Sequence, residues 1–296
     1  MKLLICTQAV DSDDPTLGFF VRWIEEFSKR CEKVTVICLR KGEYSLPDNV
    51  KVFEIGKTVG SMQKAVKFFS LAWKQRHNYN AIFVHMNPEY IVVSGLLWRL
   101  LNKRIALWYT HKSVNLKLRL AAFLSDIIFT ASRESFRLRS SKVRVMGHGI
   151  DTEFFSPDPS VARGSWALSV GRLMKSKRHD LAIRAAADDC KELRIIGDGP
   201  ERESLEALVR ELGARVRFLG GLTQAHLRDE YRKAAYLIHT SETGSLDKVV
   251  LEALACGLPV RTNDPALRAL ENASPAYIHE HHSLQGLITA IMGALS

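Results

Sequence analysis

The sequence predicts an α/β protein of two domains, each built on a doubly wound parallel sheet, and three observations support this prediction. Short runs rich in β-branched residues alternate with longer amphipathic stretches, which is typical of parallel strands joined by crossover helices. A chain of 296 residues has the length of about two domains. The alternation is interrupted at residues 151–165 by two prolines, a glycine and polar residues, which indicates a linker.

The first domain is expected to span residues 1–150. Its predicted strands are the β-branched runs at 2–6, 33–39, 50–55, 81–85, 104–110, 126–130 and 142–146, with helices at 18–30 and 61–76. The apolar run near the amino terminus has four residues, too few for the core of a signal peptide. The longest apolar stretch, Tyr90 to Trp98, is far below the ~20 residues of a membrane-spanning helix. We therefore expect a cytoplasmic protein.

The second domain is expected to span residues 166–296, after a linker at 151–165. Its predicted strands lie at 166–171, 192–197, 215–220 and 235–240, and its helices at 179–187, 200–212, 223–234, 246–256 and 283–295. In doubly wound sheets, ligands bind beyond the carboxyl ends of the strands. The residues that follow each strand are therefore where a site should be sought.

Composition and charge narrow the function classes. With 46% hydrophobic and 25% charged residues the chain is globular, and a formal net charge of +10 favours anionic partners. The sequence contains no nucleic-acid-binding motif. The cysteines are scattered, without the Cys-x-x-Cys spacing of redox or zinc sites, and we interpret them as reduced core residues: Cys6, Cys31, Cys38, Cys190 and Cys256.

A basic turn follows the first strand of the second domain. Gly171 and Arg172 come directly at the strand end, and Lys177 precedes the next helix. Two cations at the carboxyl edge of a sheet suit a diphosphate, because fixed cations stabilise the negative charge that develops on a leaving nucleoside diphosphate. The alternative is a solvated basic turn, since Lys175 and Arg178 are also cationic.

The next strand ends in a glycine-containing turn. Gly197 and Gly199 allow a close approach of the backbone to a ligand, and Pro200 suits the first turn of a helix. The dinucleotide fingerprint would need a glycine where Arg202 stands. The alternative is an ordinary connection between strand and helix.

The last predicted strand leads into a Thr-Gly-Ser loop at 243–245 and then a helix. Free N–H groups at that helix start can bind phosphate. Asp247 and Glu252 lie five residues apart, about 140° around an ideal helix, so they point to different faces. Asp247 has an alternative role beside the helix dipole. Because Glu252 is surrounded by apolar residues, its carboxylate needs a partner or a ligand.

Together, these motifs resemble glycosyltransferase family 4, the retaining transferases of GT-B fold. The segments VGRLMKSKRHDLAIRAA, LRIIGDGPERESLEAL and LEALACGLPV lie at the family's spacings, and GHGIDTEFF extends the resemblance to about 126–260. The resemblance implies two Rossmann-like domains that face each other across a cleft, with Arg172 and Lys177 on the donor diphosphate and Glu252 on the ribose hydroxyls. The donor-binding residues it implies are Gly171, Gly197, Gly199, Thr243, Gly244, Ser245, Leu246, Asp247, Lys248 and Glu252.

The resemblance also implies a mechanism. Retaining members use a front-face displacement in which the leaving phosphate accepts the proton of the acceptor, so no metal, cofactor or side-chain nucleophile is expected. His111, after the strand at 104–110, is expected to face the donor sugar, unless it is a surface histidine. Acceptor contacts are expected from Asp14, Gly18 and Phe19. His148 and His239 are further candidates, whereas His281 and His282 are expected in an exposed loop.

Two features depart from the family pattern. The first of its two glutamates separated by seven residues would fall at Gly244, so recognition of the sugar cannot be assigned there. The chain ends soon after the helix predicted at 283–295, without the long extension that commonly returns to the first domain. We therefore expect looser domain closure or a need for a partner.

The predicted function is transfer of a hexose from a nucleotide-diphosphate-sugar to a lipid-linked sugar, a glycan or a small molecule, in the synthesis of cell-envelope glycan, glycolipid or polysaccharide. One alternative is a binder or epimerase of sugar nucleotides with the same fold and no transfer. The other is a basic adaptor for polyanions or membranes.

A basic helix at 61–76 adds a possible partner. Its cations, Lys64, Lys67, Lys74 and Arg76, lie beside the aromatic residues Phe68, Phe69 and Trp73. This composition predicts peripheral contact with an anionic membrane at its inner face. The alternative is a helix that packs its aromatic residues on its own sheet.

Overall fold

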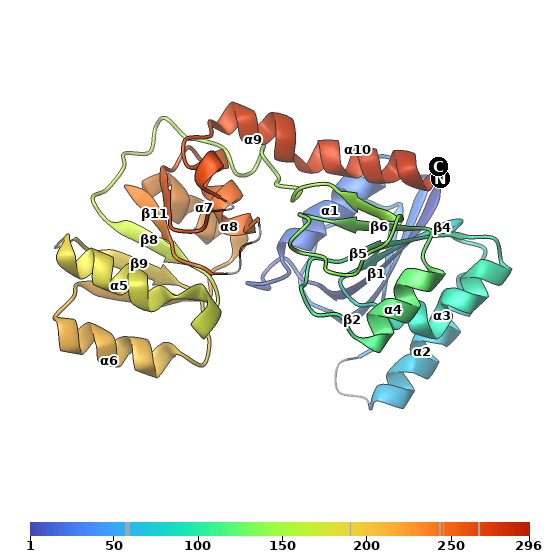
Figure 1. Ribbon diagram of the computed structural model, residues 1–296. Coiled ribbons are helices and arrows are strands. Elements are labelled where there is room, and N and C mark those ends of the chain that lie inside the picture. Colours follow the sequence, from blue (N-terminus) through green and yellow to red (C-terminus); the bar gives the residue numbers. More distant parts are fainter. Residues whose placement is uncertain (57–59, 190, 243, 245, 266) are drawn as a thin grey trace. The chain divides into compact units, whose positions relative to one another are not determined.

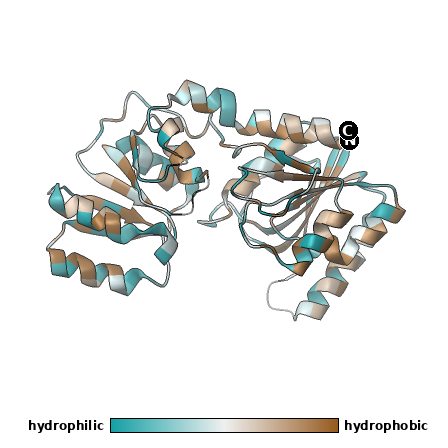
Figure 2. Cartoon of the chain, in the orientation of Figure 1, coloured by the Kyte–Doolittle hydropathy of each residue, from teal (hydrophilic) through white to brown (hydrophobic). Residues whose placement is uncertain are grey.

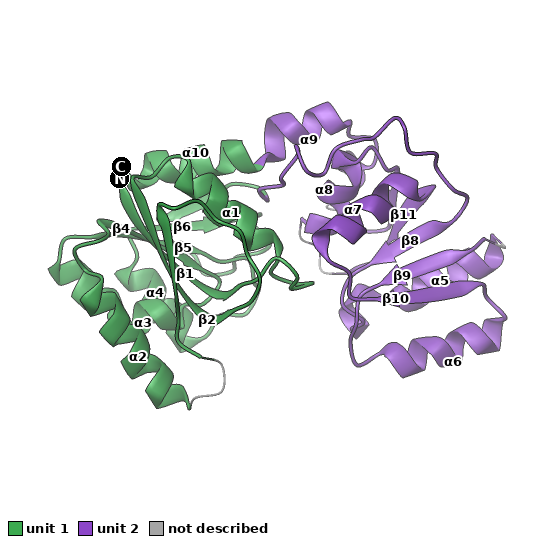
Figure 3. Ribbon diagram, turned by 180° about the vertical axis from the view of Figure 1, so that it is seen from behind, with its two compact units in different colours: residues 1–147, 284–296 green, residues 148–283 purple. Residues whose placement is uncertain are grey.

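The structure, a computed structural model, describes residues 1–56, 60–189, 191–242, 244, 246–265 and 267–296 (Figure 1). The chain divides into two compact units (Figure 3): residues 1–147 with 284–296, and residues 148–283. Each unit has a parallel sheet with helices on both faces. This arrangement confirms the predicted pair of doubly wound α/β units.

The sheet of the first unit has the order β3-β2-β1-β4-β5-β6-β7, and its described pairings are parallel. The strands are β1 (Lys2–Val10), β2 (Lys33–Lys41), β3 (Val50–Glu54), β4 (Ala81–His85), β5 (Arg104–Trp108), β6 (Ile127–Thr130) and β7 (Val143–Val145). The order reverses between β1 and β4, because β1 pairs with β2 on one side and with β4 on the other. Ligands of doubly wound sheets bind beyond such a reversal.

Helices cover both faces of this sheet because its strands are apolar on both sides. Alternate residues of β1 enter separate cores: Leu3 and Ile5 pack with α1 (Phe19–Ser28) and α10 (Leu284–Leu295), while Leu4 and Cys6 face the opposite layer. That layer holds α2 (Ser61–Lys74), α3 (Glu89–Leu100) and α4 (Leu116–Leu124). The sequence analysis did not resolve α3 and α4.

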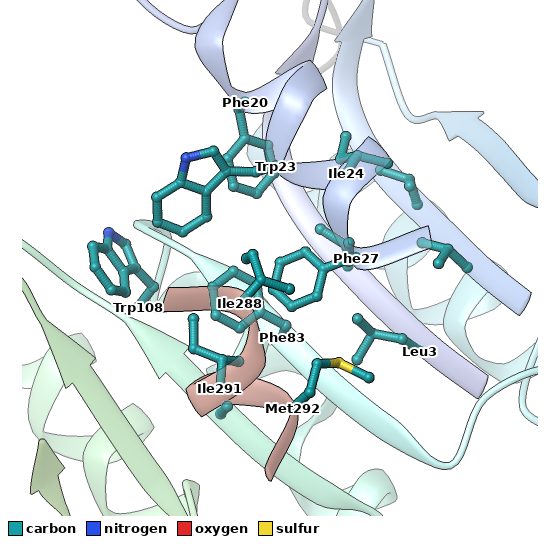
Figure 4. Packing of buried hydrophobic residues seen from close by; sticks show 14 of the residues in the cluster. Leu3, Phe20, Trp23, Ile24, Phe27, Phe83, Trp108, Ile288, Ile291 and Met292 are labelled. Atoms are coloured by element: carbon teal, nitrogen blue, oxygen red, sulfur yellow. The ribbon is translucent and has the colours of Figure 1, made fainter. Parts of the chain in front are cut away.

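The final helix, α10, belongs to the first unit and not to the predicted domain 166–296. One side of the helix is buried in the core beneath α1, at Leu284, Leu287, Ile288, Ile291, Met292 and Leu295. Figure 4 shows Ile288, Ile291 and Met292 beside Phe27 and Phe83. Each buried aliphatic side chain stabilises the fold by roughly 1.5–3 kcal/mol. The predicted assignment of residues 284–296 to the second domain is therefore wrong, and this short segment returns to the first unit.

The second unit has the strand order β10-β9-β8-β11-β12, again with parallel pairings. Its strands are β8 (Ala167–Val170), β9 (Leu193–Ile196), β10 (Val216–Gly220), β11 (Tyr236–His239) and β12 (Val260–Thr262). Helices α5 (His179–Asp188) and α6 (Arg202–Leu212) cover one face; α7 (Gln224–Lys233), α8 (Lys248–Ala255) and α9 (Pro275–His282) cover the other. Short 3-10 turns lie at Lys175–Lys177 and Arg268–Leu270.

The predicted linker, 151–165, is part of the second unit. Its Phe155 is buried in the core, and Arg163 donates to the carbonyl oxygens of Ala234 at 3.0 Å and Gly257 at 2.7 Å. The segment therefore packs on the unit that follows it.

His281 and His282 were expected in an exposed loop. This prediction is wrong, because both residues lie in α9 and His282 is half-buried.

Two further expectations concern cysteines and membrane spans. Cys6, Cys31, Cys38 and Cys256 are free and buried, as predicted, and Cys190 lies outside the described residues. None of the helices in the described ranges is both long and apolar enough to span a bilayer.

Candidate functional site

The candidate site lies where the strand order of the second unit reverses, between β8 and β11. The carboxyl end of β8 leads into the basic turn 171–178, and that of β11 leads into residues 240–247. Hydrogen bonds join the two segments directly: the Thr240 hydroxyl donates to the carbonyl oxygens of Arg178 at 2.8 Å and Lys177 at 3.1 Å, and the Glu242 N–H donates to Ser176 at 3.2 Å. Two of the three predicted motifs therefore form one site at the position where such sheets bind ligands.

The two glycines after β9 make room for the basic turn itself. A Cβ on Gly197 would lie 2.1 Å from the carbonyl oxygen of Gly171, and one on Gly199 would lie 2.4 Å from that of Leu173. The Leu173 N–H in turn donates to the Asp198 carbonyl oxygen at 3.0 Å. The described contacts thus give both glycines a packing role, which is consistent with the alternative of an ordinary connection between strand and helix. Ligand contact by either glycine stays a prediction.

The cations of this turn fall into two groups. Arg178 is paired with Asp180, at 3.0 Å, and with Glu242. Arg172 is exposed, and the described residues provide no ion-pair partner for its guanidinium. The turn is therefore not a uniformly solvated basic segment. Arg178 is held in ion pairs within the protein, whereas Arg172 is exposed to solvent.

Lys177 and Asp247 form an ion pair across the site, and His239 joins it. The ammonium of Lys177 contacts Asp247 Oδ2, and His239 Nε2 lies 3.2 Å from the same oxygen. Burial alone would raise the pKa of Asp247, but the hydrogen bond from His239 and the charge of Lys177 outweigh it and hold that pKa well below its usual range. Asp247 is the residue before α8, yet its side chain makes no capping hydrogen bond. Its carboxylate instead contacts the ammonium of Lys177 and Nε2 of His239.

The hydrogen bonds continue from His239 to the loop. Because ionised Asp247 accepts from Nε2, neutral His239 carries its proton there, and Nδ1 accepts from the Thr262 hydroxyl at 3.0 Å. The Thr262 oxygen accepts from the N–H of Asp264 at 3.1 Å, and Asp264 Oδ2 accepts from the Gly244 N–H at 3.0 Å. A carboxylate thus reaches the position of Gly244 from the segment after β12. Thr243 and Ser245 lie outside the described residues.

Glu252 already has partners inside the protein. The ammonium of Lys248 lies 2.6 Å from Glu252 Oε1, and the Tyr231 hydroxyl donates to Oε2 at 3.4 Å. The Glu252 side chain is only 2% exposed. The sequence required a partner or a ligand for this carboxylate, and the structure provides a partner. The contact of Glu252 with ribose and the donor-binding role of Lys248 stay predictions.

His148 makes a hydrogen bond to the loop before α8. Its Nε2 donates to the carbonyl oxygen of Leu246 at 2.9 Å. Burial lowers the pKa of His148 to about 4, so the ring is neutral near pH 7. The described contact gives His148 a role in positioning Leu246.

In the first unit, His111 is exposed with a defined tautomer. The Ser113 N–H lies 3.1 Å from His111 Nδ1, which therefore accepts, and the Ser113 hydroxyl lies 2.8 Å from the same nitrogen. A neutral ring then carries its proton on Nε2. An exposed Nε2–H is a suitable donor to a sugar hydroxyl.

The predicted acceptor residues fold into a tight turn before α1. Asp14 Oδ1 accepts from the N–H groups of Thr16 and Leu17, each at 2.8 Å, and Oδ2 pairs with Arg40. A Cβ on Gly18 would lie 2.7 Å from the Asp14 carbonyl oxygen, and half-buried Phe19 has its ring centroid 6.0 Å from that of His85. Asp14 and Gly18 thus have structural roles, and acceptor contact by the three residues stays a prediction.

No group of three or more histidine, cysteine, aspartate or glutamate side chains that could hold a metal ion occurs among the described residues. The residues that sequence analysis missed are Asp264 and Thr262, and it gave no role to the pairing of His239 with Asp247. Short β12 was not predicted, so no sequence signal placed Asp264 beside Gly244.

Comparison with known proteins identifies a family model and several relatives. Residues 153–280 match the family described as glycosyl transferases group 1. Sulfoquinovosyl transferase SQD2 of Arabidopsis thaliana is 27% identical in an alignment 186 positions long, which covers 58% of this chain and 35% of that protein. A D-inositol 3-phosphate glycosyltransferase of Kribbella flavida is 36% identical in an alignment 146 positions long, which covers 40% of this chain and 34% of that protein. The matches span about a third of the length of these relatives.

Solved structures match over the whole chain. HepE of Anabaena, in complex with UDP and glucose, gives a TM-score of 0.74 at 16% identity and covers 100% of this chain and 99% of its own. Sucrose-phosphate synthase of Thermosynechococcus elongatus gives 0.73 at 16% identity, covering 99% of this chain and 98% of its own. At this level of identity the likeness establishes the fold, and the predicted GT-B class is confirmed.

Proposed function

We propose that this chain is a member of the glycosyl transferases group 1, the family whose model residues 153–280 match, and that it transfers a sugar from a nucleotide-diphosphate-sugar to an acceptor. The observation that supports this best is the placement of Arg172 and Lys177 at the strand reversal of the second unit, in a turn fixed by hydrogen bonds to residues 240–242. The relative HepE is a protein in complex with UDP and glucose. A nucleotide-diphosphate is therefore the ligand we assign to these cations.

The chemistry follows from the charges. An ammonium has three N–H groups, and Asp247 occupies one on Lys177, so others remain for phosphate oxygens. Arg172 offers a planar set of donors suited to the same group. Both cations stabilise the charge that develops on the leaving diphosphate more than that of the intact donor. We propose a retaining, metal-independent transfer of a hexose in which the leaving phosphate accepts the proton of the acceptor.

We further propose that His111 contributes a hydrogen bond to a hydroxyl of the sugar. Its Nδ1 is occupied by Ser113, so the exposed Nε2–H is the donor. The Thr243-Gly244-Ser245 segment and Asp247 are proposed to complete sugar recognition. Cell-envelope glycan, glycolipid or polysaccharide synthesis is the process in which we expect the transfer.

A nucleotide screen tests this proposal. UDP-, GDP-, ADP- and dTDP-sugars should differ in how far they raise the melting temperature, because a ligand at one hundred times its Kd stabilises the folded state by about 2.7 kcal/mol. A matching nucleotide should then support measurable sugar transfer. Stabilisation with no transfer to any acceptor, or with change of the sugar alone, would instead support a same-fold binder or epimerase. No response to any nucleotide-sugar would contradict the donor site.

We also propose peripheral contact with an anionic membrane through α2. The structure separates its aromatic residues: Phe68 packs in the core, whereas Phe69 and Trp73 are exposed. Met62 and Val66 on the same helix are 77% and 62% exposed, and Lys67 and Lys74 are exposed as well. Hydrophobic residues also continue over α3 and α4 (Figure 2), with exposed side chains at Val92, Leu96, Leu100, Leu116, Leu120 and Phe123.

Co-sedimentation tests the membrane contact. The protein should bind vesicles that contain anionic lipid and not neutral vesicles, and binding should weaken with salt because it depends on lysine charge. Replacement of Phe69 and Trp73 by serine should reduce it, whereas Tyr277→Ser, at an exposed aromatic residue of the second unit, should not. Equal binding to both vesicle types would contradict the proposal.

A further inference from the structure

The first unit contains a cavity of about 420 Å³ between α2 and α3. Its lining is mainly apolar and includes Leu39 of β2, Phe68 of α2, and Tyr90 and Val93 of α3. This volume falls in the range of ~300–1,000 Å³ that is typical of small-molecule sites. The cavity is therefore large enough for part of a ligand.

The cavity lies at the carboxyl edge of the sheet, near the reversal between β1 and β4. Its lining includes Ile55, directly after β3, and Asn87, two residues after β4. The Asn87 side chain accepts a hydrogen bond from Gln8 Nε2 on β1 at 2.8 Å, which joins the cavity to the reversal point. This is the edge at which doubly wound sheets bind ligands.

Helix α2 presents two different apolar faces. Ser61, Lys64, Ala65 and Phe68 line the cavity at the i, i+3, i+4, i+7 spacing of one helical face. The exposed residues Met62, Val66, Phe69 and Trp73 form a second stripe, about 120° around an ideal helix from the first. The wall of the cavity and the exposed apolar stripe thus belong to the same helix.

The charges at the cavity favour an anion. Lys64 is half-buried among apolar groups, and the described residues include no ion-pair partner for it. Lys117 also lines the cavity, but it lies 3.2 Å from the carboxylate of Glu89, another lining residue. Because Glu89 is already matched by Lys117, Lys64 is the unmatched charge. A cation on an apolar wall is stabilised by an anionic partner.

We propose, on the basis of the transfer function above, that this cavity binds the acceptor and that the acceptor is a phosphorylated amphiphile. Its apolar chain would lie against Leu39, Phe68 and Val93, and its phosphate would accept hydrogen bonds from Lys64. The cavity has both parts that such a molecule requires: an apolar lining and a cation, Lys64, that has no ion-pair partner among the described residues. A free sugar or a free phosphate would leave the apolar lining unused.

Calorimetry with monomeric alkyl phosphates, below their micelle concentrations and without nucleotide, tests the proposal. Decyl phosphate should bind at one saturable site, and affinity should rise about fourfold per methylene from hexyl to decyl phosphate, because each buried methylene contributes a constant increment. Decanol and glycerol phosphate should each bind at least tenfold more weakly. A chain-length dependence without a phosphate dependence would overturn the assigned class.

Variants locate the binding. Lys64→Ala should weaken decyl phosphate binding about tenfold or more, as expected for loss of a charged hydrogen-bond donor, and Ala65→Phe should abolish it by filling the cavity. Lys74→Ala, an equal charge change on the exposed side of α2, is the matched control and should have no effect. Unchanged binding in both cavity variants would overturn the proposal, and Lys64→Ala keeps the test valid if Ala65→Phe fails to fold.

Nucleotide binding by the same samples separates this proposal from the proposed function. If a nucleotide-sugar stabilises the protein but alkyl phosphates do not bind, the acceptor assignment fails and the donor assignment stands. If alkyl phosphates bind and no nucleotide does, the cavity holds a phosphorylated amphiphile outside any transfer reaction, and the acceptor role fails.

Discussion

The two units share one architecture but place different chemistry at the reversal of their sheets. In the second unit, Lys177, Asp247 and His239 form a polar network after β8 and β11, in which His239 is buried and the two charged side chains are half-buried. In the first, an apolar cavity lies at the corresponding edge and is lined by Lys64, for which the described part of the chain offers no ion-pair partner. Since the fold is common to both, the difference shows that the ligand is determined by side chains at the strand ends and not by the sheet.

The largest expected effect is on transfer, from loss of the cations of the second unit. Arg172→Ala and Lys177→Ala should each lower kcat/KM by 10²- to 10³-fold, which is the usual effect of removing one group that stabilises transition-state charge. Lys175→Ala, in the same turn and exposed, is the matched control. Full activity in both variants would exclude the turn as the diphosphate site.

The next effect is on stability of the first unit. Ile288→Ala on α10 should reduce the free energy of unfolding by about 3 kcal/mol, because it leaves a cavity in the core beneath α1. Thr289→Ala, on the exposed side of the same helix, should change it by less than about 0.5 kcal/mol. Equal melting of the two variants in thermal denaturation would show that α10 does not stabilise this unit.

Asp247→Asn tests whether the network serves catalysis or only the helix start. The variant should lose transfer while it retains nucleoside-diphosphate affinity, because Lys177 keeps its charge and only the proposed contact of Asp247 with the sugar is lost. Since the pKa of folded Asp247 lies below its ordinary value, the ion pair stabilises the protein above about pH 4 and loses this effect as pH falls further. Wild type should therefore lose more stability than the variant on acidification below pH 4.

If transfer survives and only melting falls, Asp247 is a residue of the helix start. Sugar selection would then have to come from the loop backbone or from His111.

The smallest effect concerns His148. Burial holds its pKa at about 4, below the ordinary value near 6.5, so the unfolded chain binds more protons between these values and stability falls as pH decreases through them. His148→Gln should make the melting temperature less sensitive to pH between 6.5 and 4.5. His226→Gln, on the exposed start of α7, is the control. Equal pH dependence of all three proteins would contradict the role assigned to His148.

The sequence predicted the parallel units and the polar segments of the second unit because strand alternation and strand-end motifs are local patterns. It missed α3 because apolar residues lie both on its buried side, at Ile91 and Trp98, and on its exposed side, at Leu96 and Leu100. Apolar residues on two sides hide the helical period on which prediction depends.

The contacts that sequence analysis could not supply join distant positions. The Gly244 N–H donates to Asp264 only because β12 pairs with β11. Helices α10 and α1 pack together although more than two hundred and fifty residues separate them in the sequence. Such pairings depend on tertiary packing and leave no local pattern. For the same reason, Lys64 and Val93 could not be placed in one cavity from their sequence positions.

The position of α10 also affects the order in which the protein can fold during synthesis. Residues 148–283 emerge from the ribosome before 284–296, so the second unit can be completed while the first still lacks its last helix. Until α10 is made, the core that contains Phe27 and Phe83 is incomplete, and its apolar side chains are available to chaperones or to aggregation. Residues 1–147 are therefore synthesised before the second unit, but their own unit is complete only after residues 284–296 have been made.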